Sequence, residues 1–344
     1  MERKGTGMRT RWPRVAVAVG LLVAVGAIGC STSGQRNELL VYNGQHESLA
    51  KEWIDAFTKE TGIKVNYRQG GDTELGNQLV AEGTASPADV FITENSPAMA
   101  AVEHAGLFAD VDQQTAAQVP PQYRPASNKW TGVAARATVF VYNTAKLPVD
   151  QLPKSLLDLQ QPAWKGRWAA PPSKADFQAI VAALLQLEGE PATAQWLAGM
   201  KANAVAYQDN VATLKAVNSG QVDGGVIYHY YWFRDQAKTK EMSGNTALHY
   251  FRNQDPGAFV SLSGGGVLKS SKKQDKAQQF LRFVTGKSGQ QVLQNGDTFE
   301  YPVGSGVPAN PALVPLDQLQ APTIDPSTLD AKKVSDMMTR GGLL

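Results

Sequence analysis

Short apolar runs alternate with segments of helical periodicity from residue 38 onward. The run ELLVYN at residues 38–43 predicts a buried strand, and the following SLAKEWIDAFTKETG places Leu49, Trp53 and Phe57 on one helical face before it ends at Gly62. The next segments, IKVNYRQ, TELGNQLVAEG and ADVFITE, predict a strand, a helix and a strand. This β-α-β-α-β order predicts a parallel sheet with helices on both faces.

The same alternation continues to about residue 286. Strands are predicted at RATVFVYN, GRWAAPPS, VDGGVIY and GAFVSLSGGGVLK, and helices at DFQAIVAALLQLEG, ATAQWLAGMKAN, NVATLKAVNSG and QDKAQQFLRFVTG. The proline-containing segment 307–326 is interpreted as a linker. The pattern predicts an α/β protein long enough for two domains.

The first 29 residues break this pattern and predict a lipoprotein signal peptide. Five basic residues precede the run VAVAVGLLVAVGAIG, which is too short for a durable membrane span and ends in small residues before Cys30. Cys30 is the only cysteine, and we expect it to be lipidated, with residues 30–37 as a polar tether. The alternative is an ordinary signal cleavage site. A lipidated Cys30 leaves no thiol for catalysis or for an iron–sulfur cluster.

Charge then narrows the partners of the mature chain. The full sequence has 33 basic and 31 acidic residues, and removal of the signal leaves 28 and 30, a net charge of −2. The chain has no arginine-rich stripe. We therefore expect no nucleic-acid partner, and contact with a membrane only through the lipid anchor.

Few residues remain that carry chemistry. Of the four histidines, His104 and His249 are interpreted as structural, and the chain has no H-x-x-x-H, G-x-S-x-G or P-loop pattern. His46 follows the first predicted strand and Glu94 ends the third. Because ligands bind beyond the carboxyl ends of parallel strands, we expect both at one rim of the sheet, although each can also serve the end of a neighbouring helix.

The stretch VIYHYYWFRD, residues 226–235, contains the adjacent Tyr230 and Tyr231. Adjacent side chains diverge in a strand or a helix, so the two phenols can converge only at an irregular junction, which we predict between VDGGVIY and YWFRDQAK. Packing in a core is the alternative for such a cluster, and it is the role predicted for Trp232. His229 is expected to point away from the tyrosines.

Phenols deprotonate near neutral pH only beside a strong cation, such as Fe(III). Glu94 and two phenolates would cancel its three charges, and His46 would add a fourth ligand. Zinc or copper would be expected to use more histidine or cysteine than this chain offers.

Several motifs in order resemble the bacterial periplasmic ferric-ion-binding proteins of iron-uptake ABC transporters. They are VYNGQH, TGIKV, SPADVFITEN, HYYW and DPGAFVSLSGGGVLKSS, and the likeness runs from about residue 38 to the C-terminus. It implies a two-lobe, type II periplasmic-binding-protein fold in which each lobe is a mixed, mostly parallel sheet flanked by helices. Two strands, near residues 136 and 260, cross between the lobes. The first lobe would comprise residues 38–135 and about 261–312, and the second residues 136–260 and about 313–344.

The resemblance also implies a site between the lobes. Its metal ligands fall on His46, Glu94, Tyr230 and Tyr231. Phosphate, carbonate or water would complete the coordination, and the residues that match the family's anion site are Ser173, Lys174, Ala175, Asn210 and Arg136. Lys174 replaces a glycine of the family, and Tyr228 stands where an asparagine is frequent.

Local chemistry adds expectations for this anion site. Ser173 is predicted to cap a helix with Asp176 three residues on, which would expose backbone amides to an anion. For Arg136, a surface ion pair at the hinge is an equal alternative.

The leading hypothesis is therefore a monomeric, extracytoplasmic, lipid-anchored receptor, and not an enzyme, that captures Fe(III) and delivers it to an ABC transporter permease. A receptor of the same fold for a polyamine, a phosphonate or a sugar phosphate is the alternative. A non-haem iron oxygenase is a third hypothesis, but it requires a second histidine beside the carboxylate.

Overall fold

The computed structural model describes residues 1–2, 38–304 and 306–344. The predicted signal peptide (except Met1 and Glu2), Cys30 and the tether lie outside the described residues. Residues 38–304 and 306–344 belong to one compact unit. No helix of the described residues is long and apolar enough to cross a membrane.

Strands and helices alternate along this unit as the periodicity predicts. The strands are β1 Leu39–Asn43, β2 Val65–Gln69, β3 Val90–Ile92, β4 Thr131–Asn143, β5 Trp168–Ala170, β6 Ala204–Ala206, β7 Gly224–Tyr228, β8 Thr246–His249 and β9 Val260–Val267. The helices are α1 Glu47–Thr61, α2 Asp72–Glu82, α3 Ser96–His104, α4 Gln113–Gln118, α5 Ala175–Asn203, α6 Asn210–Asn218, α7 His229–Lys238, α8 Gln274–Thr285, α9 Lys287–Asn295 and α10 Ala331–Arg340. Short 3₁₀ turns are η2 Gly83–Ala85, η3 Pro121–Tyr123, η4 Val149–Gln151, η5 Leu156–Gln160, η6 Pro162–Trp164, η7 Pro256–Ala258, η8 Leu316–Gln318 and η9 Pro326–Thr328.

The strands of the described residues join in one mixed sheet with the order β2-β1-β3-β9-β4-β7-β5-β6, and β8 also pairs with β4. The pairs β1–β2, β1–β3, β5–β6 and β5–β7 are parallel, whereas β9 and β4 are antiparallel to their neighbours. The predicted mixed sheet is therefore confirmed, but it is not mostly parallel. Among the described residues four strand pairs are parallel, and four at its centre, β3–β9, β4–β7, β4–β8 and β4–β9, are antiparallel.

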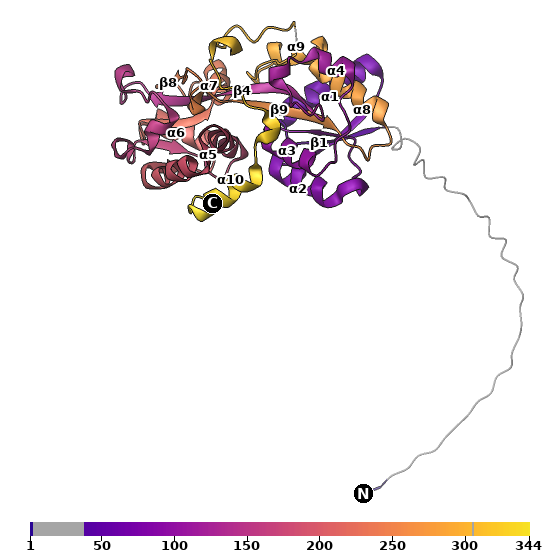
Figure 1. Ribbon diagram of the computed structural model, residues 1–344, viewed down its shortest axis with the longest axis horizontal. Helices are drawn as coiled ribbons and strands as arrows, with labels where there is room; N and C mark the ends of the chain where they lie inside the picture. Colours follow the sequence, from indigo (N-terminus) through magenta and orange to yellow (C-terminus); the bar gives the residue numbers. More distant parts are fainter. Residues whose placement is uncertain (3–37, 305) are drawn as a thin grey trace, which may run out of the picture. The chain divides into compact units, whose positions relative to one another are not determined.

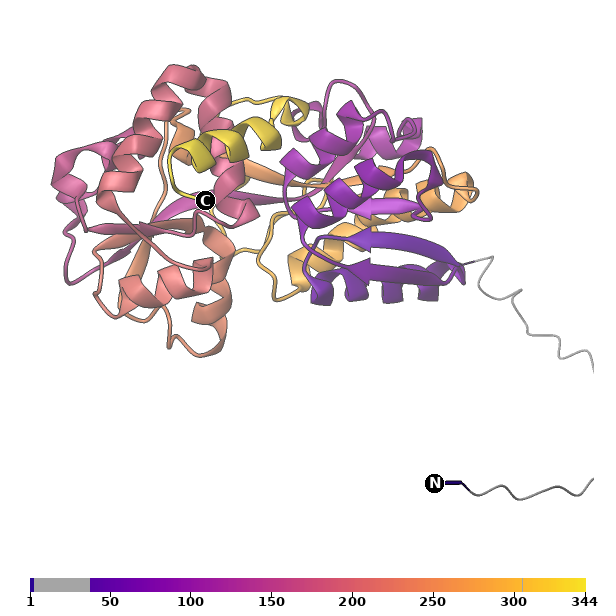
Figure 2. The ribbon, with the colours of Figure 1, turned by 90° about the horizontal axis from the view of Figure 1, so that it is seen from below.

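Strand β4 links two halves of this sheet. Its residues 131–137 pair with β9, and its residues 138–143 pair with β7 and β8. All thirteen residues of β4 are buried, as expected for a strand covered on both faces. In Figures 1 and 2, β4 and β9 run between a group that contains α1, α2 and α3 and a group that contains α5 and α6. The two crossing strands, β4 and β9, thus lie near residues 136 and 260, as predicted. The exact boundaries of the lobes stay a prediction.

The C-terminal segment also passes from one half to the other. Residues 307–326 are irregular apart from η8, as expected of a linker. The turn η9 then contacts α3, and α10 packs against α5. Lys333 of α10 pairs with Glu190 of α5 at 2.8 Å. The halves are thus joined by two central strands and by this segment.

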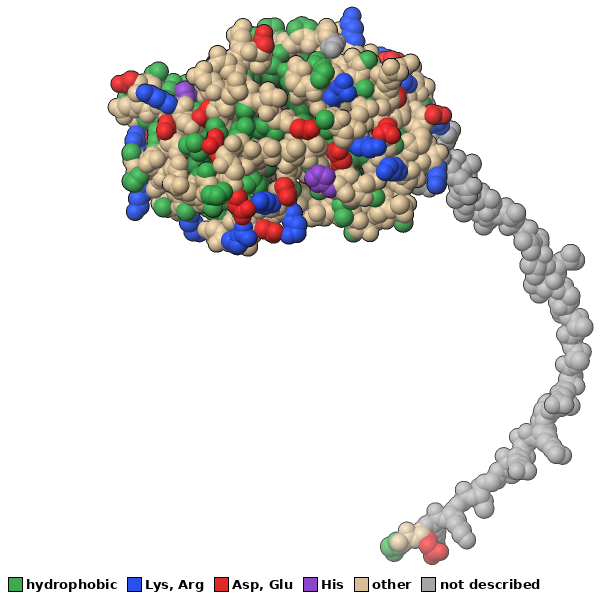
Figure 3. Space-filling model, in the orientation of Figure 1, with side chains coloured by type: hydrophobic (Ala, Val, Ile, Leu, Met, Phe, Trp, Pro, Cys, Tyr) green, Lys and Arg blue, Asp and Glu red, His purple; other side chains and the backbone are tan. Residues whose placement is uncertain are grey.

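Charged side chains of both signs lie on the surface, in keeping with the small net charge of the mature chain. On the face shown in Figure 3, basic and acidic side chains are interspersed over residues 38–344.

Candidate metal centre

His46 and Glu94 meet at the rim of the sheet, as predicted. His46 follows β1 and Glu94 follows β3, and β1 and β3 pair in parallel. The His46 Nδ1 atom lies 2.8 Å from Glu94 Oε1. His46 also occupies the position before α1, where its carbonyl accepts the Ala50 N–H at 3.0 Å, but its side chain makes no capping bond. Its backbone therefore begins the helix while its imidazole is left for the site.

Tyr230 and Tyr231 lie at a strand-to-helix junction, which confirms that prediction. Strand β7 ends at Tyr228 and α7 begins at His229, so both tyrosines belong to the first turn of the helix. Their rings stack with centroids 4.1 Å apart, and the His46 ring meets the Tyr230 ring edge-on at 5.2 Å. Tyr230 is fully buried, and its hydroxyl has no hydrogen-bond partner among the described residues.

Asp176 completes the cluster, and sequence reasoning did not identify it as a site residue. Its carboxylate accepts hydrogen bonds from Asn95 Nδ2 at 2.9 Å, from Asn210 Nδ2 at 2.9 Å and from the Tyr231 hydroxyl at 3.0 Å. A continuous series of contacts therefore runs from Glu94 through His46, Tyr230 and Tyr231 to Asp176.

The predicted Ser173 cap is wrong. The helix begins at Ala175, Lys174 is its N-cap residue, and no side chain caps it. Ser173 and Lys174 are exposed, whereas the carboxylate of Asp176 points inward to Asn95, Asn210 and Tyr231. The inward hydrogen bonds, which join distant segments, replace the local capping box.

The other residues of the predicted anion site lie near the same carboxylate. Asn210 begins α6, is buried and donates to Asp176. The Tyr228 hydroxyl lies 3.1 Å from the Asp176 carbonyl and 3.2 Å from Asn95 Oδ1. The amide and the phenol at two anion-contact positions thus bind Asp176 itself.

Arg136 is a fully buried cation behind the site. Its guanidinium donates to the Glu94 carbonyl, lies 2.8 Å from Ser263 Oγ and pairs with Glu300 at 3.1 Å. It also faces the Tyr230 ring at 5.8 Å. The surface ion pair considered for Arg136 is wrong, because its side chain is 0% exposed. A buried positive charge here favours anionic ligands in the cleft.

The metal-free cluster retains protons that a cation would have to displace. Burial, and then Asp176, raise the pKa of Tyr230 and Tyr231 well above the ordinary value. Burial and Glu94 raise the pKa of Asp176. Burial opposes the charged form of His46, but the neighbouring Glu94 raises the pKa of His46 overall. Burial likewise opposes the charged form of Glu94, but His46 and Arg136 lower the pKa of Glu94 overall. His46 and Glu94 thus each favour the charged form of the other.

No group of three or more His, Cys, Asp and Glu side chains within 38–304 and 306–344 is arranged to hold a metal ion. Any metal at this cluster therefore needs the phenols. Oxygen-rich, partly phenolate ligands suit a small, hard and highly charged cation.

Asp72 supports the turn that carries Glu94. Its buried carboxylate accepts the backbone N–H of Glu94 at 2.9 Å and that of Asn95 at 2.8 Å. Burial and the charge of Glu94 raise the pKa of Asp72 from 3.8 to about 7. This carboxyl group is therefore protonated in the folded protein at pH values where the unfolded chain has lost the proton.

Asp72 is expected to lower the free energy of unfolding of the metal-free protein as the pH rises from 4 to 7, by up to about 1.4 kcal/mol per pH unit, because the folded state binds more protons there. Urea unfolding at several pH values would measure it. Asp72→Asn should remove this part of the slope, whereas Asp55→Asn on the exposed side of α1 should leave it. Equal slopes in wild type and Asp72→Asn would contradict the assignment.

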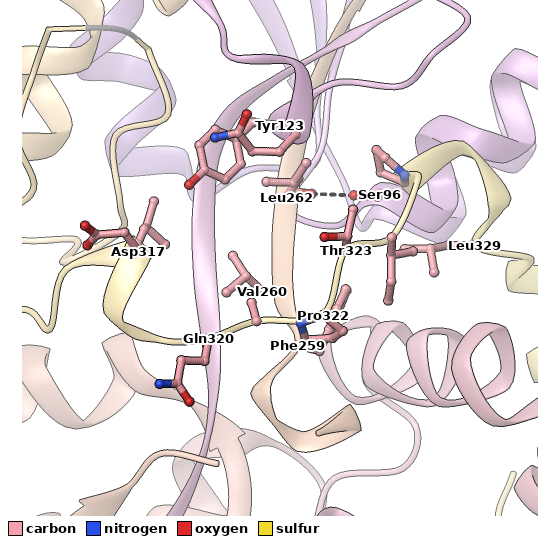
Figure 4. Close-up of a pocket in the computed structure, with 15 residues that line it drawn as sticks. Ser96, Tyr123, Phe259, Val260, Leu262, Asp317, Gln320, Pro322, Thr323 and Leu329 are labelled. Carbon is pink, nitrogen blue, oxygen red and sulfur yellow. Dashed lines mark hydrogen bonds between the residues drawn. The ribbon is translucent and has the colours of Figure 1, made fainter. Parts of the chain in front are cut away.

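A separate cavity of about 220 Å³ lies behind the crossing strands (Figure 4). Val260 and Leu262 of β9 line it, together with residues of the C-terminal segment. Ser261 and Ser263 point to the opposite face, where they contact Asn95 and Arg136. None of the predicted metal ligands lines this cavity, so it is not the metal centre.

Comparison with known proteins places the chain in a family. Residues 85–327 match the model described as "Bacterial extracellular solute-binding protein". The chain is 60% identical to the Fe(3+)-binding periplasmic protein of Serratia marcescens over 96% of this chain and 97% of that protein. It is 36% identical to the major ferric iron-binding protein of Neisseria meningitidis serogroup B over 86% of this chain and 90% of that protein.

The solved structures agree with the sequence comparison. Iron-bound HitA from Pseudomonas aeruginosa aligns with a TM-score of 0.83 at 41% identity, over 89% of this chain and 99% of that chain. The predicted two-lobe, type II periplasmic-binding-protein fold is thereby confirmed. The chain belongs to the bacterial extracellular solute-binding protein family, and its relatives in that family include ferric-iron-binding proteins.

Proposed function

We propose that this protein is an extracytoplasmic receptor that captures Fe(III) between its lobes and delivers it to an ABC transporter permease. The observation that carries the proposal is the stacked pair Tyr230 and Tyr231, in contact with His46 on one side and Asp176 on the other. The ferric-iron-binding relatives support it. The protein acts by binding, and catalysis is not part of the proposal.

The proposed ligands are five side chains: His46, Glu94, Asp176, Tyr230 and Tyr231. His46, Glu94 and Asp176 do not form a ready metal-holding group among the described residues, so closure around the cation has to bring Asp176 to it. Four of the five ligands are anionic when deprotonated and neutralise the three charges of Fe(III), and Arg136 offsets part of the excess. Binding of the cation deprotonates the two phenols, because it stabilises their charged form against burial.

Asp176 takes the place of the external anion that the resemblance implies. Asn210, expected to contact an anion, donates to the Asp176 carboxylate instead. An internal carboxylate in this position leaves one coordination position for water. The phosphate or carbonate of the initial hypothesis is therefore not required by this ligand set.

Closure and release follow from where the ligands lie. His46 and Glu94 come from the predicted first lobe, and the tyrosines and Asp176 from the second. A cation that contacts both lobes stabilises the closed form by its differential affinity. Protonation of the ligands or reopening of the lobes releases it.

Attachment to the membrane rests on Cys30. A lipid on this cysteine, followed by the tether 30–37, would hold a monomeric receptor at the outer face of the membrane, close to the permease. The signal pattern before Cys30 supports this part of the proposal.

Titration of iron-free protein with ferric nitrilotriacetate is expected to produce a visible absorption band that saturates at one iron per chain, because phenolates transfer charge to Fe(III). A parallel titration with zinc should give no such band. Absence of the band with iron would reject the function, and a polyamine, phosphonate or sugar phosphate that stabilised the protein instead would favour the non-metal receptor.

The oxygenase hypothesis lacks its second histidine. The buried His229 Nδ1 accepts the Ala137 N–H at 3.2 Å, and its Nε2 lies 2.8 Å from the Phe299 carbonyl. Burial lowers the pKa of His229 to about 3. Both ring nitrogens are occupied by the backbone, so His229 stays neutral and is not available as a ligand.

A further inference from the structure

Glu300 lies behind His46 and has a free oxygen there. Its carboxylate is fully buried. Oxygen Oε2 lies 3.1 Å from Arg136 and 3.2 Å from Gln45 Nε2. Oxygen Oε1 has no hydrogen-bond partner among the described residues, and His46 Nε2, which likewise lacks one, is 3.8 Å away. Two buried polar atoms therefore face each other slightly beyond hydrogen-bond distance.

Neighbouring contacts fix this arrangement. Tyr301 and Ala135 exchange two backbone hydrogen bonds, of 2.9 and 3.0 Å, which anchor the segment of Glu300 to β4. On the other side, the backbone N–H of His46 donates to Gln45 Oε1 at 2.6 Å, and Gln45 Nε2 donates to Ser263 Oγ at 2.8 Å. Gln45 thus contacts both the backbone of His46 and the carboxylate of Glu300.

The imidazole needs this second partner once a metal is bound. In the metal-free site, the nitrogen of His46 that faces Glu94 is hydrogen-bonded to that carboxylate. If His46 and Glu94 both become ligands, this hydrogen bond is lost, and the other ring nitrogen must carry the proton. A metal-bound histidine nearly always donates that proton to a carboxylate, a carbonyl or water, which fixes its tautomer and makes it a better ligand.

The candidates for this acceptor near His46 Nε2 are few. The side-chain oxygen of Gln45 already accepts the backbone N–H of His46, and the Arg136 side chain has only donors. Glu300 Oε1 is buried, charged and unused.

We propose that Glu300 is a positioning residue. In the iron-loaded protein its Oε1 atom accepts a hydrogen bond from the ring Nε2–H of His46 and so holds the imidazole in its ligating tautomer. This inference rests on the proposed function. His46 exchanges partners on loading, from Glu94 to Glu300, and a movement of about 1 Å closes the gap to a hydrogen bond. Glu300 does not touch the metal, and it acts through His46.

The test measures the rate at which iron is transferred from the protein to a competing chelator. It compares wild type, Glu300→Gln, His46→Ala and the double variant. Glu300→Gln is expected to release iron about 10-fold to 100-fold faster than wild type, since it loses a second-shell partner of this kind. In the His46→Ala background the same substitution should change the rate by less than about twofold, because the residue through which it acts is gone.

A matched control is Asp89→Asn. Asp89 is 2% exposed and pairs with Lys273 at 2.9 Å, so this variant also removes a buried carboxylate beside a cation, but away from the site. It should lower the midpoint of urea unfolding and leave the release rate unchanged. If Glu300→Gln folds poorly, Glu300→Asp keeps the charge beside Arg136 while it withdraws the oxygen from His46, and it is expected to release iron faster in the same His46-dependent way.

Two results would overturn the inference while leaving the function intact. One is a wild-type release rate in both Glu300 variants, and the other is an equal acceleration in the presence and absence of His46. Failure of wild type to develop the visible band would instead reject the proposed function, so the two failures are distinguishable.

Discussion

Replacement of Tyr230 and Tyr231 together by phenylalanine is expected to abolish the visible absorption of iron-loaded protein and to weaken iron binding by well over about 100-fold, more than the loss of an outer-shell partner. The two hydroxyls are the source of the phenolate charge transfer. Phenylalanine keeps the stacked rings, whose centroids lie 4.1 Å apart, so the packing of α7 should be preserved. Absorbance titration and equilibrium competition with a chelator measure the two effects.

The matched control replaces two other tyrosines whose hydroxyls bond side chains that are not proposed ligands. Tyr67 donates to Glu47 at 2.7 Å and Tyr207 donates to Gln221 at 2.9 Å. A Tyr67→Phe, Tyr207→Phe protein should keep the band and the affinity. A band that survived in the Tyr230→Phe, Tyr231→Phe protein would assign the colour to other groups and remove the basis for the ligand set.

Asp176→Ala is expected to make iron binding depend on an added anion. Wild type should bind Fe(III) equally well with and without phosphate or carbonate, because Asp176 provides the carboxylate. In the variant, Asn210 loses its acceptor while Asn95 keeps Asp72, and affinity without an anion should fall by about 100-fold. Phosphate can occupy the vacated space beside the start of α5 and recover most of the loss. Competition titrations in anion-free and phosphate buffers would measure this.

Asp209→Ala is the control for Asp176. Asp209 caps α6, where its carboxylate accepts the Ala212 N–H at 2.7 Å. Its loss should cost about 1 kcal/mol of stability and create no dependence on anions. A wild-type protein that itself required phosphate, together with an Asp176→Ala variant no weaker than wild type, would restore the external anion of the initial hypothesis.

Residues placed by local rules were predictable from the sequence. His46 and Glu94 each follow a strand of a β-α-β-α-β pattern, and the topology of parallel strands brings such positions to one rim. The junction before Tyr230 was predictable because two adjacent phenols converge only where a strand turns into a helix.

Residues placed by long-range contacts were not predictable. Asp176 has the right spacing from Ser173 for a capping box, so the local pattern suggested the wrong role, and its partner Asn95 is 81 residues away. Glu300 lies in a segment without periodicity, 255 residues from Gln45. The first part of β4 was also not predicted, because residues 131–135 are mostly small. The strand begins at Thr131 and not at Arg136. Hydrophobic periodicity records burial on one face, and it carries no information on which polar groups meet across a cleft.

The C-terminal segment sets a mechanical limit on the protein. The neighbouring strands β4 and β9 form a two-stranded strap between the halves. The third connection, through η9 and α10, stands off from that strap across the cavity of about 220 Å³. A third connection beside a two-stranded hinge restricts the motions that the hinge alone would allow. We therefore expect this segment to limit how the halves move relative to each other, so that the ligands they carry meet in a similar alignment each time the cleft shuts.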